Sequence, residues 1–507
     1  MSLQSKSSKK LSREDLNREF NDKQTWELWV VFVIKLFTSM MFLIDDLTFL
    51  VFCQYEFGMT QQESGIMFCV SALFLFAYGL TISGYLIDKM GVKFSLILGL
   101  SLIGLGKFLL TFVTQRVHLY LIMCTISPFG ISIIFPTLVL AVKKLSHPGA
   151  MRSLAFNIYY GFMVFGALIG GPLVDFIRRD IGKTQFEYLH TNVETGAIEK
   201  RYLVVSAWRT IAFFGFIISV GMLILMCTYK KQVENDFIER HLTRSERERL
   251  SCSEISSEII KDFKFWRFML FSFVIVGSKM VFSLLFFMIP KMITQNDGEN
   301  APFGIYMSAA PMLIIIFLLF LAPVQANYEP YDLILVGTVI ATLGPIPMFF
   351  GMNLINFMLF IIIISFAEAL YSPMINVFAF NFTKEGREGT FLTLTSAPSY
   401  FTMAITGVLG GYLLEQYYPV KEDATHHREP AYIWLTIIAC SLFSLICLYI
   451  GKNYFDIKEK ETKALEIRDQ RQSRSQNGIL YSKDDFFLTQ GAPGKLKKSR
   501  STKSSSG

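Results

Sequence analysis

Long apolar stretches alternate with short polar connections along most of this chain. Twelve of these stretches approach the roughly 20 residues that an α-helix needs to cross a bilayer. The first six cover about 26–53, 64–87, 94–113, 119–142, 153–177 and 208–228. The second six cover about 265–293, 302–324, 332–350, 355–380, 391–414 and 432–450. The pattern predicts an all-α membrane protein with twelve transmembrane helices, numbered here as spans one to twelve.

Polar segments divide the chain into five parts. An N-terminal tail (1–25) precedes a first six-helix bundle (26–228). A charged linker (229–264) then leads into a second six-helix bundle (265–450). Within the linker, an amphipathic stretch at 254–263 fits either a helix on the membrane surface or a solvated connection. The basic, Ser-rich C-terminal tail (451–507) is predicted to be disordered.

Lysine and arginine gather in the N-terminal tail and in the connections after spans two, four and six. With twelve spans, all of these segments lie on one side of the membrane. The connection after span five is also basic, but it contains glutamates as well. The positive-inside rule assigns the basic side to the cytosol. We therefore expect a multi-pass protein of the plasma membrane or an endomembrane, with both termini cytosolic.

The overall composition agrees with this assignment and narrows the chemistry. Apolar residues make up 52% of the chain, and charged residues make up 18%, below the roughly 25% of soluble domains. The seven cysteines show no metal-ligand spacing, and the histidines lie outside the span interiors. No nucleotide-binding glycine loop occurs. These features argue against a membrane-embedded transferase or an ATP-driven pump. We expect no enzyme activity, no metal, no cofactor and no nucleic-acid partner.

An internal repeat supports the division into two halves. A shift of 240 residues superposes Gly170, Gly171, Leu173 and Asp175 on Gly410, Gly411, Leu413 and Glu415. Small residues allow membrane helices to approach closely. The predicted helix-packing positions in spans five and eleven are Gly166, Gly170, Gly171, Pro172, Gly410 and Gly411.

The connection between spans two and three carries the most specific motif. It contains Gly84, Asp88, Lys89, Gly91 and Lys93. This spacing resembles the signature loop of the major facilitator superfamily, G-x-x-x-D-[RK]-x-G-[RK]-[RK], although Val92 replaces a basic residue. The resemblance implies two six-helix repeats, transport by alternating access, and a latch in which the aspartate faces a helix N-terminus. The alternative is an ordinary tight turn with cytosolic lysines. The matching connection at 324–331 lacks the motif, so the latch is expected on one side only.

Two further segments resemble the proton-coupled oligopeptide transporters. They are 152–160 with Gly166 in span five, and the span-ten segment from Glu368 to Pro373. In that family the span-ten glutamate faces the substrate. The chain departs from the family pattern at Val164, where an asparagine is usual, and it lacks the span-one ExxER motif. The resemblance therefore leaves a peptide and another small polar solute as alternative substrates. Tyr159, Tyr160 and Tyr371 are predicted to line the cavity.

Six charged residues lie well inside the predicted spans, away from their ends. They are Lys35, Asp45, Asp46, Lys107, Lys279 and Glu368. A charge at mid-bilayer costs at least about 2.5–3.5 kcal/mol, so such residues usually face a cavity or a partner. In the superfamily, spans one, four, seven and ten line the central cavity.

The sequence predicts a role for each of these charges. Glu368 is predicted to bind substrate or protons, with a structural salt bridge as the alternative. Lys279 is expected to pair with it or to bind a substrate carboxylate. Asp45 and Asp46 face either the cavity or a solvated mouth. Lys35 is expected to extend its ammonium to the cytosolic surface, and Lys107 to form a structural pair.

The function expected from these observations is secondary active transport. The partners would be membrane lipid, a small polar solute (a peptide, an amino acid or another organic solute) and protons. The carrier would act as a monomer by alternating access, as a symporter if protons drive it. A transport-inactive sensor or scaffold with the same fold is the alternative.

Overall fold

A computed structural model of the protein describes most of both predicted bundles. The described residues are 26–146, 150–181, 185–191, 198–204, 206–230, 263–298, 300–351, 353–380, 396–420 and 428–455. The N-terminal tail, the amphipathic linker stretch at 254–262 and the C-terminal tail beyond residue 455 lie outside this part of the chain.

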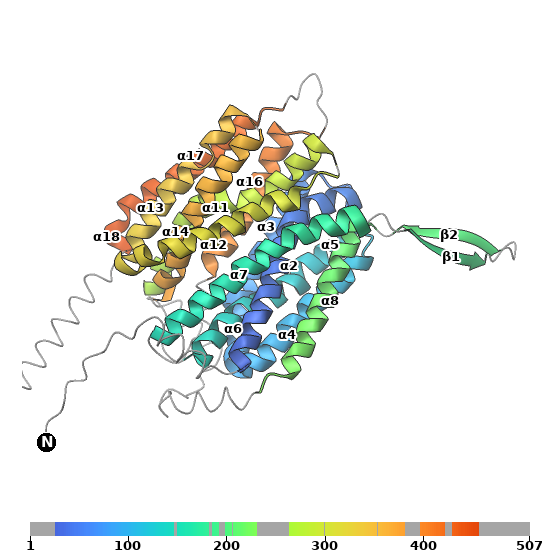
Figure 1. Ribbon diagram of the computed structural model, residues 1–507, viewed down its shortest axis with the longest axis horizontal. Helices are drawn as coiled ribbons and strands as arrows, with labels where there is room; N and C mark the ends of the chain where they lie inside the picture. The colour runs from blue at the N-terminus through green and yellow to red at the C-terminus, as the bar shows by residue number, and fades with distance from the viewer. Residues whose placement is uncertain are drawn as a thin grey trace, which may run out of the picture. The chain divides into compact units, whose positions relative to one another are not determined.

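Helices account for nearly all of the described residues (Figure 1). The first half contains α2 (Trp26–Phe57), α3 (Gln61–Tyr78), α4 (Gly84–Phe112), α5 (Arg116–Leu121), α6 (Ser127–Leu145), α7 (Ala150–Phe176) and α8 (Ala207–Cys227). Short π-helical segments connect or extend these helices at Gly79–Ser83, Ile122–Ile126 and Ile177–Ile181. The second half contains α11 (Phe263–Asp297), α12 (Phe303–Asn327), α13 (Pro330–Leu343), α14 (Leu354–Phe380), α16 (Ala397–Tyr417), α17 (Pro430–Ile450) and α18 (Lys452–Phe455). A 3₁₀ segment at Ile346–Phe350 follows α13.

Ten helical runs in this part of the chain are long and apolar enough to cross a membrane. One of them, Gln61–Phe112, has 52 residues and would be about 78 Å long if straight, far more than a bilayer of about 30 Å. Its backbone leaves the helical conformation at Gly91, with φ 76°, so the run divides there into spans two and three. Adding α16, which has 21 residues, accounts for the remaining predicted span.

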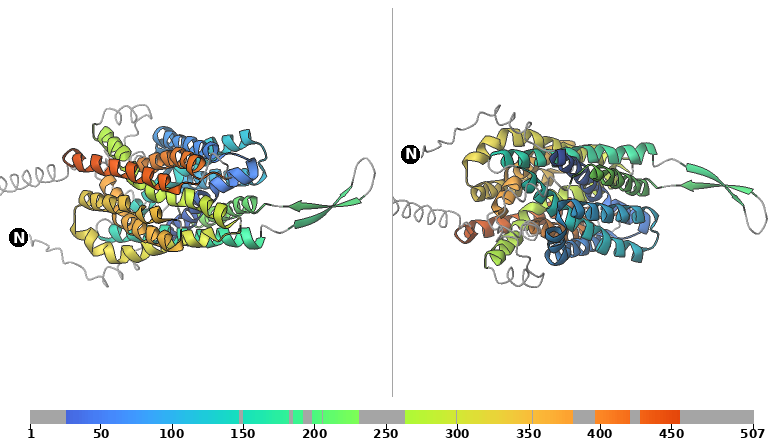
Figure 2. Two further views of the ribbon diagram at one scale, coloured as in Figure 1. Left: turned by 90° about the horizontal axis from the view of Figure 1, so that it is seen from above. Right: turned by 90° about the horizontal axis from the view of Figure 1, so that it is seen from below.

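The second half repeats the packing of the first. In the first half, α2 packs on α7, and α4 packs on both α6 and α8. The corresponding pairs in the second half are α11 with α16, and α13 with α14 and α17. Each pair involves helices at the same places in the order of six. Figures 1 and 2 show the helices lying side by side along a common direction.

Contacts between the halves follow the same symmetry. Helix α3 packs along α16, and α7 packs along α12. A smaller contact joins α2 to α11. Spans two and eleven, and spans five and eight, therefore form the two main seams between the halves.

Large apolar side chains on the outside of the helices match a lipid environment. Phe320, Leu319 and Phe350 are 73%, 72% and 80% exposed, respectively. Soluble monomers rarely expose apolar surface on this scale. The first-half core is built by smaller aliphatic side chains on facing helices, such as Val31, Leu96 and Ile134. The helices therefore present apolar residues to each other and to the membrane.

The connection between spans five and six contains the two strands that the structure describes. Strands β1 (Gln185–Thr191) and β2 (Ile198–Val204) pair antiparallel, with Tyr188 opposite Arg201. The sequence analysis treated this segment only as a charged loop between spans five and six. The all-α class therefore holds for the membrane region, with one two-stranded ribbon outside the spans.

Candidate functional site

Helix α14 carries the mid-span carboxylate of Glu368. This side chain is only 8% exposed. Its Oε2 atom has no hydrogen-bond partner among the residues that the structure describes. A buried polar atom left without a partner is costly. Such an atom in a transmembrane helix is therefore a candidate for binding a proton or a solute.

Pro373 interrupts the hydrogen bonding of α14 just beyond Glu368. A proline has no N–H, so the carbonyl of Ala369, four residues earlier, lacks its helical donor. Gln325 on α12 supplies that donor, since its Nε2 lies 2.8 Å from the Ala369 oxygen. Gln325 therefore supports α14 next to Glu368. The sequence does not single out Gln325, because its role depends on which face of α12 meets α14.

Polar side chains from two other helices approach Glu368. Tyr160 on α7, Lys279 on α11 and Tyr371 on α14 all interact with it electrostatically. Ser372 lies beside the Tyr160 hydroxyl. We call these five residues the central polar cluster. Because Tyr160 belongs to the first half and the others to the second, the cluster spans the boundary between the halves.

The two charged groups of the cluster are not paired with each other. Among the described residues, no ion pair joins Lys279 to Glu368. The buried hydroxyl of Tyr371 approaches the Glu368 carboxylate, but neither this hydroxyl nor Glu368 Oε2 makes a hydrogen bond of good geometry to a described residue. Among the described residues, the structural salt bridge considered as the alternative for Glu368 is therefore not formed. Both a donor and an acceptor are available to a bound polar group.

Tyr159, which precedes Tyr160, contacts a different cation. The Lys35 ammonium lies 5.1 Å from the centre of the Tyr159 ring and 4.8 Å from that of Phe135. Lys35 is only 5% exposed. The prediction that its ammonium extends to the cytosolic surface is therefore wrong. Two aromatic faces stabilise the cation inside the first half instead.

The aspartates of span one differ from Glu368. Asp45 forms an ion pair with Lys107 of α4, which confirms the structural pairing predicted for that lysine. Asp45 therefore already has a partner, and we leave it out of the proposed site. Asp46 interacts electrostatically with Asp45, and its place in the cavity stays a prediction.

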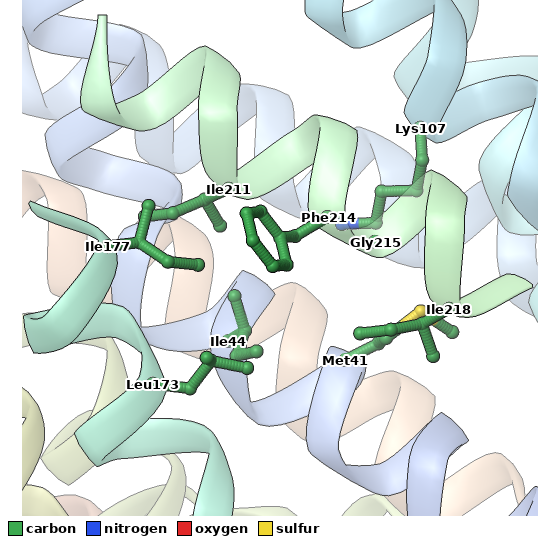
Figure 3. A pocket seen from close by; sticks show the side chains of 9 residues that line it. All are labelled: Met41, Ile44, Lys107, Leu173, Ile177, Ile211, Phe214, Gly215 and Ile218. Carbon is green, nitrogen blue, oxygen red and sulfur yellow. The ribbon is translucent and has the colours of Figure 1, made fainter. Parts of the chain in front are cut away.

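A small pocket lies next to Lys107 (Figure 3). Its volume is about 10 Å³, about the minimum needed to hold one water molecule. Figure 3 shows Lys107 reaching past Gly215 on α8, among aliphatic and aromatic side chains. The lining residues are Met41, Ile44, Lys107, Leu173, Ile177, Ile211, Phe214, Gly215 and Ile218. This pocket is too small and too apolar to hold a polar solute.

The predicted packing glycines of α7 lie where helices meet. A Cβ atom on Gly166 would lie 2.1 Å from the Leu36 oxygen, and one on Gly171 would lie 2.1 Å from the Gly304 oxygen. Gly170 also faces α2, at 3.1 Å from the Met40 oxygen. Pro172 differs, because its side chain is exposed and borders a shallow surface hollow.

The glycines of α16 make equivalent contacts. A Cβ atom on Gly411 would lie 2.7 Å from the Gln61 oxygen of α3. One on Gly410 would lie 3.0 Å from Leu284 of α11. Gly411 and Gly171 therefore each face a helix of the opposite half.

The motif between spans two and three forms the turn at Gly91. Its left-handed φ of 76° is a conformation that glycine adopts without steric cost. The Lys93 ammonium donates to the Tyr229 carbonyl at 2.5 Å, and the Lys89 ammonium lies 5.6 Å from the centre of the Tyr85 ring. Asp88 and Lys89 are exposed. Lys93 thus ties the turn to the end of the first half.

Sequence comparison decides the family. The sequence model of the Major Facilitator Superfamily matches residues 28–365 and 300–492. The chain belongs to the Major Facilitator Superfamily. No curated protein matches its sequence significantly.

Solved structures of this superfamily share the fold. A POT family transporter in complex with 5-aminolevulinic acid is 12% identical, with a TM-score of 0.61 over 86% of this chain and 98% of that chain. A peptide transporter POT in complex with sulfate is 13% identical, with a TM-score of 0.59 over 87% and 98%. The nucleoside transporter NupG is 12% identical, with a TM-score of 0.60 over 84% and 99%.

Membership in the Major Facilitator Superfamily confirms the predicted family and the major facilitator fold. It identifies the chain as a multi-pass integral membrane protein and a secondary transporter of small solutes. The solved structures that share this fold include POT family transporters.

Proposed function

We propose that this protein moves a small polar solute together with protons, by alternating access through the central polar cluster. The observation that carries the proposal is the buried carboxylate of Glu368, which has a free Oε2 atom next to Lys279. The solute would be a peptide, an amino acid or a related organic molecule. The POT family structures, which hold 5-aminolevulinic acid or peptide-like ligands, support this class.

The charges of the cluster suit a solute with both a donor and an acceptor. Lys279 can bind a carboxylate, and the Glu368 carboxylate can accept from an ammonium or an amide. When Glu368 takes up a proton, the cluster gains one positive charge, which favours an anionic group on the solute. Proton uptake and solute binding at the same cluster would thus be coupled.

Alternating access would proceed by movement of the bundle at 26–228 against the bundle at 265–450. Tyr160 would leave the Glu368 side of the cluster when the halves separate, because it belongs to the other bundle. The tails and the linker at 229–264 would lie in the cytosol, on the side indicated by the basic connections. We expect the carrier to work as a monomer in the plasma membrane or an endomembrane.

Replacing Lys279 by alanine should weaken solute binding. Loss of a charge-assisted hydrogen bond costs about 1.5–3 kcal/mol, so the apparent KM should rise about 10- to 100-fold. Lys279→Arg retains the charge and should keep most of the affinity. Equal KM values for wild type and Lys279→Ala would remove this lysine from the site.

Asp88→Asn should slow transport without preventing membrane insertion. The exposed aspartate lies in the signature loop, where a charge facing a helix N-terminus would hold one state of the cycle. We expect a several-fold lower uptake rate at normal protein levels. An unchanged rate would favour the alternative of an ordinary turn.

The proposed function is tested by uptake into proteoliposomes that contain the purified protein. Candidate peptides, amino acids and related organic acids are screened with and without an inwardly directed proton gradient. We expect at least one polar solute to accumulate only with the gradient. Absence of flux for every class, with correctly inserted protein, would favour the sensor or scaffold alternative.

A further inference from the structure

The two carboxylates related by the internal repeat make equivalent contacts across the halves. The Asp175 carboxylate on α7 accepts from the backbone N–H of Ile305 at 2.8 Å. The Glu415 carboxylate on α16 accepts from the backbone N–H of Gln62 at 3.0 Å. Each carboxylate thus meets the first turn of a helix in the opposite half, α12 and α3, respectively.

Both contacts satisfy N–H groups that a helix leaves open at its start. The first N–H groups of an α-helix have no partner within the helix, and the partial positive charge there favours an anion. In α12 the preceding Pro302 supplies no capping side chain. In α3, Thr60 caps the N–H of Glu63, and Glu415 satisfies the N–H one residue earlier. Each helix start is therefore completed by a carboxylate from the other half.

Glycine brings each carboxylate within reach. Gly171 and Gly411 precede Asp175 and Glu415 by four residues, about one helical turn, so each pair shares one helix face. A Cβ atom on Gly65 of α3 would lie 2.9 Å from the Gly411 Cα. Helices α7 and α12 approach equally closely, since a Cβ atom added to Gly171 would lie 2.1 Å from the Gly304 oxygen. Larger residues would separate the helices and draw the carboxylates away.

Asp175 is also held in place by its own helix. Its carboxylate lies 3.2 Å from Arg178 Nη1, and both side chains are almost fully buried. The Arg178 guanidinium lies 4.3 Å from the centre of the Phe303 ring in α12, and it donates to the Ala301 carbonyl at 3.3 Å. The contact therefore includes an ion pair, the Phe303 ring and the backbone groups of Ala301 and Ile305.

Both contacts lie at the same face of the membrane. Helices α3 and α12 begin there, and α7 and α16 end there. With the predicted orientation this is the non-cytosolic face. An opening between the two halves at this face separates α7 from α12 and α3 from α16, so it breaks both contacts.

We propose that Asp175 and Glu415 are gating residues, which form two symmetric carboxylate locks that hold the non-cytosolic face closed. Both locks must break before the face opens and must re-form after it closes. The inference rests on alternating access, part of the proposed function, but it concerns residues outside the central polar cluster.

Spin labels can measure the state of this face directly. Labels are placed at Val117, in the first half, and Phe350, in the second, after the native cysteines have been replaced. These positions are 67% and 80% exposed, and both follow the spans that end at this face. Distances are measured by pulsed electron paramagnetic resonance on the full-length protein in lipid nanodiscs.

We expect mainly the short, closed distance in the otherwise wild-type protein. Asp175→Ala and Glu415→Ala should each raise the ratio of open to closed protein about three- to tenfold, and the double variant should raise it further. Asp175→Asn and Glu415→Gln keep the side-chain size and should act in the same direction, more weakly. Glu56→Gln is the matched control, because Glu56 pairs at 2.7 Å with Arg209 of its own half, and it should leave the ratio unchanged.

Two results would overturn the proposal. One is an unchanged distance distribution in both the alanine and the amide double variants. The other is an otherwise wild-type protein found only at the open distance. Because this measurement needs no solute, an opened face in a protein without flux would contradict the proposed function while leaving the locks supported.

Discussion

Glu368→Gln is expected to abolish proton-driven accumulation while leaving solute exchange partly intact. Glutamine keeps the shape of the side chain but cannot cycle between charged and neutral forms. With one proton per solute, a gradient of one pH unit can sustain about a tenfold concentration ratio, since one pH unit corresponds to 1.36 kcal/mol. The variant should reach a ratio of about one. Net accumulation and counterflow are measured on the same proteoliposomes.

The control for this substitution is Asp332→Asn. Asp332 lies in the first turn of α13, where it pairs with Lys452 near the surface. Its loss should leave accumulation close to that of the wild type. A Glu368→Gln carrier still driven fully by the gradient would refute the coupling role. Loss of folding on Glu368→Gln would instead favour a structural role for the carboxylate.

Gly171→Leu is expected to destabilise the protein strongly. The added Cβ atom alone would overlap the backbone oxygen of Gly304 at 2.1 Å, and a backbone oxygen cannot rotate away. Overpacking of this kind typically costs about 1–3 kcal/mol, and it would also separate α7 from α12. The expected results are a lower melting temperature in detergent and little transport.

Gly161→Leu provides a control in the same helix. A Cβ atom on Gly161 would meet nothing within 4 Å, so leucine should be accepted there. Gly411→Leu at the equivalent seam should resemble Gly171→Leu. Normal stability of both seam variants would show that the repeated glycines have no packing role.

Hydropathy was sufficient to place the helices, because a helix that crosses a bilayer needs about 20 mostly apolar residues. Some helix ends differ from the predicted span ends, because capping and proline residues, and not hydropathy, decide where a helix begins or ends. For example, α2 continues to Phe57, and α16 begins at Ala397 just before Pro398, six residues after the predicted start. The ribbon of β1 and β2 is not predicted, because the prediction rests on long apolar stretches and these two strands are short and polar.

Side-chain partners were less predictable than helices. The sequence indicates that Lys107 needs a partner, but several acidic residues could have served, and only packing selects Asp45. Lys35 looked able to reach the surface because of its long side chain, yet Phe135 and Tyr159 hold it inside. The contact between Gln325 and α14 depends on which faces of two helices meet, which hydropathy does not encode.

The repeat was the most informative sequence feature for the seams. The alignment of Asp175 with Glu415 was visible from the sequence, but their partners lie 130 and 353 residues away along the chain. Nothing local in the sequence pairs a carboxylate with the start of a distant helix. The three-dimensional arrangement therefore supplies the partners of residues that the repeat only marks as equivalent.

Proton movement caused by the solute tests the central claim most directly. Proteoliposomes are loaded with a pH-sensitive dye, and a transported solute is added outside without any imposed gradient. The account predicts acidification of the interior by wild-type protein and none by Glu368→Gln. Solute entry by the wild-type protein without acidification, or equal acidification by Glu368→Gln, would contradict it.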